Sequence, residues 1–132
     1  FVNPEITTRF WFTKSSGRLV PGQEVTWTWE MSGASAPVTV KAVEPNRRIE
    51  IEWPGAHAPN TVEWRFTEMP NDSTFVEITS SGFAGEPDEI VAEALDSTEG
   101  FTLVLAGLKA LLEHGIELNL VGDRYPAGLD QH

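Results

Sequence analysis

The hydrophobic period of this chain changes once along its length, and that change decides the fold class. Between Pro21 and Ser81, apolar and polar residues alternate, which is the pattern of β-strands with one buried face. Between Asp88 and His114 there is no proline, the apolar residues recur at helical spacing, and Gly115 follows as a typical helix end. This order predicts an α+β fold, with strands first and then one long amphipathic helix that packs on a face of their sheet.

Turn residues divide the alternating region into about five strands. Turns at residues 44–46 and 70–72 join neighbouring strands, and we expect sequential strands to pair antiparallel because that connection is the shortest. Residues 3–5, Asn-Pro-Glu, have the character of a helix start and predict a short helix over 4–11. The tail from Ile116 keeps an apolar alternation and is expected to pack in part.

Bulky aromatic residues gather on one face of the predicted sheet. They share the inward parity, and the apolar stripe of the long helix should meet them. The sheet contributes Trp27, Trp29, Trp53, Trp64 and Phe66, and the helix contributes Phe101, Leu105, Leu108 and Leu112. Packed solid, these side chains form a core, whereas under a strongly curved sheet they enclose an apolar pocket. Composition alone favours the solid core.

The reverse side of the long helix is small or apolar rather than charged. It consists of Gly100, Leu103, Ala106, Gly107 and Ala110. A face of this kind is expected to be covered, either by a terminal segment of the same chain or by a second subunit. A homodimer is therefore one of the alternatives.

The acidic residues of the strands take the parity opposite to the aromatic ones and are predicted to face solvent. They are Glu30, Glu50, Glu52, Glu63 and Glu77. A carboxylate on the outer face of a sheet cannot act as an acid or base in an internal cavity. His57 lies in a loop, His114 ends the helix and His132 is terminal, which is not a metal-ligand spacing. We predict no catalytic residue, no metal site and no cofactor.

Composition excludes several classes of protein. Nine Lys and Arg against twenty Asp and Glu give a net charge of −11, the opposite of a nucleic-acid-binding surface. The absence of Cys excludes disulfides, thiolate metal sites and a cysteine nucleophile. No stretch approaches the ~20 apolar residues that span a bilayer, so no membrane insertion is expected. A chain of 132 residues supports one core, and we expect a cytoplasmic protein.

Several segments, in one order, follow the pattern of a known family. They are residues 6–12, 21–30, 43–46, 74–78, 82–83, 100–101, 105–110 and 112–115. The chain resembles the START-like (SRPBCC, helix-grip) superfamily, in the branch similar to the C-terminal domain of the activator of the ninety-kilodalton heat-shock protein ATPase. The resemblance extends over about residues 3–126.

This resemblance implies a curved antiparallel sheet that grips a long C-terminal helix, with a hydrophobic cavity between them. Family members begin with a strand and a helix upstream of the segment that matches Asn3. We therefore expect residues 1–132 to be a single START-like domain that lacks the family's first strand and most of its first helix.

The leading functional hypothesis is that a small hydrophobic or aromatic molecule binds between sheet and helix. The predicted cavity wall consists of Trp11, Trp27, Trp29, Trp53, Trp64, Phe66, Phe101, Leu105, Leu108 and Leu112, with Trp11 at the mouth. Enzymes of the superfamily place polar side chains in the cavity, and by parity none is expected here, which favours binding over catalysis.

Two alternatives remain open at this point. One is a chaperone-associated interaction module, in which the acidic outer face contacts a basic partner. The other is an enzyme similar to polyketide cyclases and dehydratases. That enzyme would need an inward polar group, and the candidates are Glu30, Arg65 and His114, displaced by a β-bulge.

Overall fold

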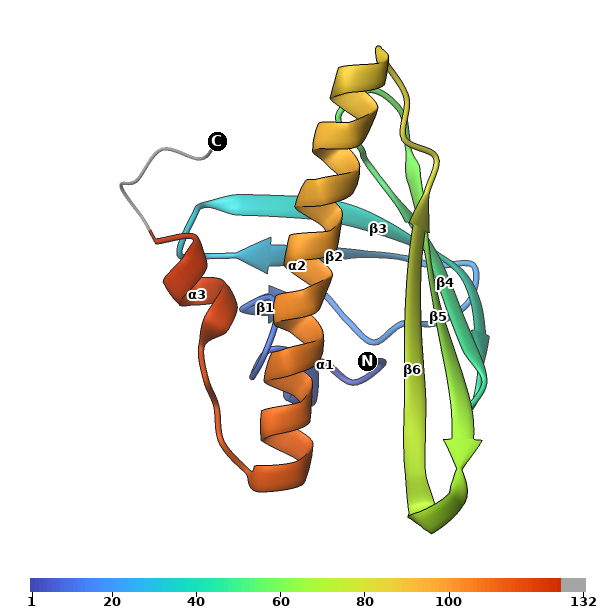
Figure 1. The fold of residues 1–132 in the computed structure, drawn as a ribbon, viewed down its shortest axis with the longest axis vertical. Helices are drawn as coiled ribbons and strands as arrows, with labels where there is room; N and C mark the ends of the chain where they lie inside the picture. The colour runs from blue at the N-terminus through green and yellow to red at the C-terminus, as the bar shows by residue number, and fades with distance from the viewer. Residues whose placement is uncertain (127–132) are drawn as a thin grey trace.

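Six strands form one antiparallel sheet in the computed structural model, which describes residues 1–126 (Figure 1). Each strand pairs with its neighbours in the chain, so the predicted α+β class and the pairing of sequential strands are confirmed. The two-residue strand β1 was not predicted from the sequence. The strands are β1 (Lys14–Ser15), β2 (Glu24–Trp29), β3 (Ala34–Glu44), β4 (Arg48–Trp53), β5 (Asn60–Met69) and β6 (Ser73–Ser81). His132 lies outside the described residues.

The long helix α2 (Pro87–His114) agrees with the predicted one. A capping box at Glu86 opens it, and Gly115 closes it in the left-handed conformation at φ 65°. The short helices α3 (Leu120–Arg124) and η1 (Pro70–Asp72) were not predicted. Among the described residues, no helix combines the length and the apolar character needed to cross a membrane.

The first helix is shorter than the sequence predicts. α1 covers only Pro4–Thr7, with the Asn3 side chain accepting a hydrogen bond from the Glu5 N–H at 3.0 Å. Residues 6–8 are all β-branched, and such residues lose side-chain freedom in a helix. The chain leaves the helix there, and this frees Phe10, Trp11 and Phe12 to turn into the core.

The sheet is strongly curved, and α2 lies across its concave side. In Figure 1, β2 and β3 pass behind α2, whereas β5 and β6 run beside it. The register between β3 and β4 shifts between Val40 and Ala42, and bulges of this kind bend and twist a strand locally. This is the helix-grip arrangement that the resemblance implied.

The two-residue alternation predicts the buried face of the sheet correctly. Trp27 and Trp64 are each 1% exposed, and they lie in one cluster with the inward aliphatic residues of β2 to β5. In α2 the buried residues are Val104, Gly107 and Leu111. The helix therefore packs on the core through its C-terminal half, and its N-terminal half extends beyond the core.

Segments of the same chain cover part of the reverse side of α2. A side chain at Gly107 would place its Cβ 3.4 Å from both the Cβ and the carbonyl oxygen of Phe10. Helix α3 lies against α2 (Figure 1), and its Val121 is buried. One of the two expected coverings is thus present, and the homodimer stays a prediction.

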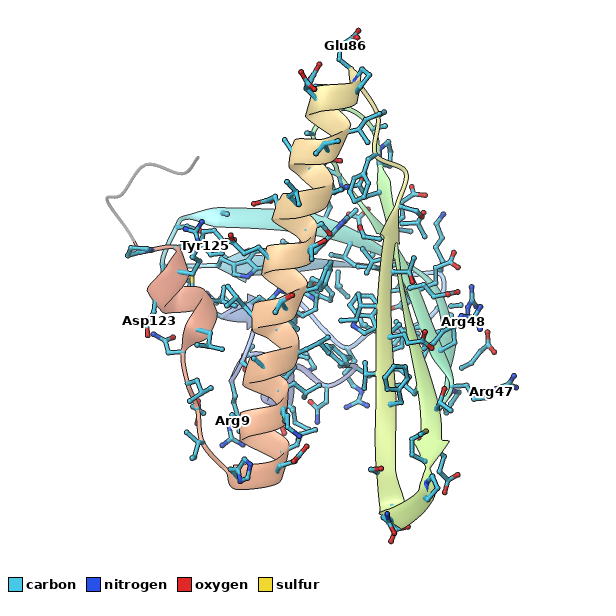
Figure 2. The ribbon with its side chains drawn as sticks, viewed as in Figure 1. Arg9, Arg47, Arg48, Glu86, Asp123 and Tyr125 are labelled. Carbon is cyan, nitrogen blue, oxygen red and sulfur yellow. The ribbon has the colours of Figure 1, made fainter. Side chains whose placement is uncertain are left out.

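Side chains on the outer face of the sheet form several ion pairs. Arg48 contacts Glu44 at 2.8 Å and Glu63 at 2.7 Å, and it also pairs with Glu50. Figure 2 shows Arg47 and Arg48 pointing away from α2. The predicted outward carboxylates Glu50, Glu52, Glu63 and Glu77 are on this side, whereas Glu30 lies in the turn after β2.

Candidate functional site: an aromatic cavity with a polar end

A cavity of about 760 Å³ lies under the N-terminal half of α2. Its walls come from the segment before β1, the β2–β3 turn, the loop after β4, the residues around the end of β6, the first half of α2, and α3. This volume falls within the range typical of small-molecule sites. The cavity exists because the sheet curves away from α2 where the helix has left the core.

Four aromatic rings form one side of the cavity. Trp11 lies with its ring centroid 6.1 Å from that of Trp53 and 5.7 Å from that of Phe101. Trp53 and Phe101 stack at 6.0 Å with 25° between their planes, and Trp29 is 6.4 Å from Trp11. Rings in such arrangements present a large, rigid apolar surface.

Polar side chains from α2 also line the cavity. Glu89, Glu93 and Asp96 all line the cavity, because positions separated by four and three residues share one face of a helix. Glu89 pairs with the Nε2 of His57 at 2.5 Å, which ties the loop after β4 to the helix. The Asp96 carboxylate makes no hydrogen bond or ion pair within residues 1–126.

Glu93 and Asn60 are joined in this polar part of the lining. Glu93 accepts a hydrogen bond from the backbone N–H of Ala56 at 2.8 Å and another from the Nδ2 of Asn60 at 3.2 Å. Asn60 is only 7% exposed, and its Oδ1 has no donor among the described residues. Its amide is therefore oriented by Glu93, with one acceptor left unused.

Gly55 is required by the close approach of the loop to Asn60. A Cβ at this position would lie 2.3 Å from the carbonyl oxygen of Ala58 and 2.6 Å from the Oδ1 of Asn60. A side chain would clash with both atoms. Glycine keeps the loop closed on β5.

Tyr125 is a half-buried phenol in the lining of the cavity. Its ring lines the cavity from the end of α3, and Figure 2 shows it beside α2. Burial, together with the nearby charges of Asp96 and Glu99, raises the pKa of the Tyr125 phenol above its ordinary value. The charge of Arg124, whose guanidinium carbon lies 4.9 Å from the centroid of the Tyr125 ring, opposes this rise.

The structure brings together only some of the residues predicted for the cavity wall. Trp11, Trp29, Trp53 and Phe101 line it. The remaining predicted residues lie elsewhere: Trp27 and Trp64 are buried in the core, Phe66, Leu105 and Leu108 are half-buried beyond the cavity, and Leu112 is 65% exposed. The prediction that Leu112 lines the cavity is wrong, because the buried face of the helix is centred on Val104, Gly107 and Leu111.

The expectation that no polar side chain faces the cavity is wrong. His57, Asn60 and the three carboxylates of α2 all line it. The helical spacing of residues 89, 93 and 96 puts these carboxylates on one face, and the two halves of the helix considered separately would have predicted them. By contrast, Glu30, Arg65 and His114 are absent from the described lining. The three residues named for the enzyme alternative therefore do not line the cavity.

Comparison with protein families decides the relationship. Residues 1–113 match the family model described as "Activator of Hsp90 ATPase homolog 1-like protein". The chain belongs to this family. The AHSA1-like fold over these residues also agrees with the START-like superfamily to which the sequence was compared above. No curated protein matches the chain.

Solved structures share the AHSA1-like fold. Protein SSP2350 from Staphylococcus saprophyticus is 30% identical, with a TM-score of 0.73 over 89% of this chain and 82% of that one. Protein MLL2253 from Mesorhizobium loti is 23% identical, with a TM-score of 0.67 over 87% and 92%. DynU16, from the dynemicin biosynthetic locus, is 18% identical, with a TM-score of 0.70; 88% of this chain spans 41% of it.

Proposed function

We propose that this AHSA1-like domain binds a small, largely apolar molecule with an aromatic body in the cavity under α2. The observation that supports the proposal best is the wall of Trp11, Trp29, Trp53 and Phe101 around a volume of about 760 Å³. Burial of apolar ligand surface against these rings contributes about 25 cal/mol per Å². The polar groups of the lining fix the orientation of the ligand.

Gly100 offers a direct test, because it lines the cavity and an added Cβ there meets no atom within 4 Å. Gly100→Leu puts a branched side chain into this open space, while it replaces glycine with a better helix former. We expect the variant to keep or exceed the wild-type melting temperature and to lose binding of a neutral fluorescent probe such as Nile red. Gly100→Ala is the matched control and retains most of the binding.

The result that contradicts the proposal is a Gly100→Leu variant that is folded and binds the probe as the wild type does. Native mass spectrometry of the wild type, purified from cells and then extracted with organic solvent, provides a second measurement. A co-purifying apolar molecule supports the proposal, and the same spectrum gives the number of subunits.

The family description suggests a second candidate, an interaction with a chaperone. In that case the acidic outer face of the sheet, which includes the exposed Glu77, together with the exposed Glu30 of the turn after β2, contacts a basic surface of the partner, and binding weakens with salt. Capture of the chaperone at low ionic strength that is lost on replacing both residues with Gln, and unchanged in Gly100→Leu, supports this candidate over the cavity ligand.

A further inference from the structure

The charges that line the cavity have one sign. Glu89, Glu93 and Asp96 contribute carboxylates, and the described lining residues include neither Lys nor Arg. The one basic side chain there, His57, is held by Glu89. A ligand with a carboxylate or phosphate would be desolvated against these groups without a counter-charge. The cavity therefore disfavours anionic amphiphiles such as fatty acids.

The carboxylates are not arranged for a metal ion. Within the described residues, no group of three or more His, Cys, Asp and Glu side chains is placed to hold one. Glu93 is already hydrogen-bonded to the Ala56 N–H and to Asn60. The negative charge is thus spread along one wall, which suits a cationic group at the end of an organic molecule.

Two acceptors on this wall are unused. Asp96 has no partner within residues 1–126, and the Oδ1 of Asn60 is buried without a donor. A buried acceptor without a donor is destabilising. The Asp96 carboxylate is exposed and pairs directly with a ligand that presents N–H donors, and Asn60 lines the same cavity.

We propose that the ligand of this cavity is an aromatic amine in its protonated form, with its ring system among Trp11, Trp53 and Phe101 and its ammonium group at Asp96 and Glu93, next to Asn60. The aromatic wall reinforces the choice, since ring faces attract cations that lie near them. This inference rests on the proposed function, because it names the chemical class that the same cavity accepts.

Three probes with one ring system test the inference. They are 2-naphthylmethylamine as the cation, 2-naphthylmethanol as the neutral donor and 2-naphthoate as the anion, measured by isothermal titration calorimetry at pH 7. We expect the amine to bind about tenfold more tightly than the alcohol, the size of effect typical of a charge-assisted hydrogen bond. The naphthoate should bind more weakly than either.

Substitutions locate the source of the preference. Asp96→Asn removes the unpaired charge and preserves the shape of the side chain, so the ratio of amine to alcohol affinity should fall several-fold with little change in alcohol affinity. Glu77→Gln is the matched control, because Glu77 is exposed on β6, away from the cavity. It removes the same charge from the molecule and should leave the ratio unchanged.

The outcomes separate this inference from the proposed function. An alcohol that binds as tightly as the amine, or a ratio that Glu77→Gln lowers as much as Asp96→Asn does, overturns the preference for a cation and leaves the aromatic cavity site intact. Failure of all three probes to bind, with Gly100→Leu indistinguishable from the wild type, counts against the cavity site itself.

Discussion

At the scale of single residues, the tryptophans divide by depth into two kinds. Trp64 is 1% exposed and lies under Phe1 and Trp11, with ring centroids 5.6 and 6.0 Å away. Trp53 is half-buried, stacks on Phe101 and lines the cavity. The first kind fills the core, and the second forms the wall of the candidate site.

Substitution of each tryptophan by alanine should therefore have a different effect. Trp64→Ala opens a void in the core and should lower the free energy of unfolding by about 3–5 kcal/mol. Trp53→Ala should lower it less, because its side chain is half-exposed, but should abolish binding of the neutral probe. Urea unfolding and probe titration measure the two effects. A Trp53→Ala variant with unchanged probe affinity would remove this residue from the site.

The sequence predicts the face of each of these residues but not its depth. Parity puts Trp27, Trp29, Trp53 and Trp64 on one side of the sheet, and all four do lie there. Their depth depends on segment 10–12, which covers Trp27 by stacking Phe12 on it at 4.5 Å. That segment was interpreted as the end of a helix, so its contacts could not be foreseen from the alternation.

At the scale of elements, α2 shows why one apolar stripe along the whole helix did not predict the polar groups of the cavity. A single stripe averages over 28 residues, and the predicted stripe placed Leu112 toward the sheet and gave no polar residue of the helix a place in the cavity. In the folded chain the C-terminal half packs on the core, while the N-terminal half faces the cavity. The bounds of a helix of this length are predictable, but its change of environment depends on the curvature of the sheet.

Strand β5 provides a prediction on the pH dependence of stability. Hydrogen bonds from Arg48 and then Arg65 lower the pKa of Glu63 below its ordinary value of 4.5. A carboxyl with a lowered folded-state pKa stabilises the fold above the unfolded-state pKa, and this stabilisation is lost as the pH falls through the folded-state pKa. Glu63→Gln should therefore cost up to about 1 kcal/mol at pH 7 and progressively less below pH 4.5.

Thermal or urea unfolding between pH 3 and pH 7 measures this difference, with Glu77→Gln as the control. Glu77 lies on the neighbouring strand and makes no ion pair within the described part of the chain, so its variant should follow the wild type at every pH. A Glu63→Gln penalty that stays constant down to pH 3 would show that its hydrogen bonds, and not its charge, stabilise the sheet.

At the scale of the whole molecule, the cavity is where distant parts of the chain meet. The segment that holds Trp11, the β2–β3 turn, the loop after β4, the residues around the end of β6, the first half of α2 and helix α3 each supply part of its wall. None of the buried residues of α2 precedes Val104, so the first half of the helix is held mainly by the polar contacts to His57, Ala56 and Asn60. A ligand would add the apolar contacts that this half lacks.

Amide hydrogen exchange followed by mass spectrometry tests this division of the molecule. Regions with few buried apolar contacts open more readily than the core, so residues 88–97 should exchange faster than residues 104–111 in the free protein. Because a ligand stabilises the states that bind it, a saturating cavity ligand should slow exchange in residues 88–97 and in the loop at 54–59. The distant β5–β6 turn at 69–73 should exchange at an unchanged rate. Equal protection along all of α2 in the free protein would show that the helix opens as one unit and that the cavity is rigid before the ligand arrives.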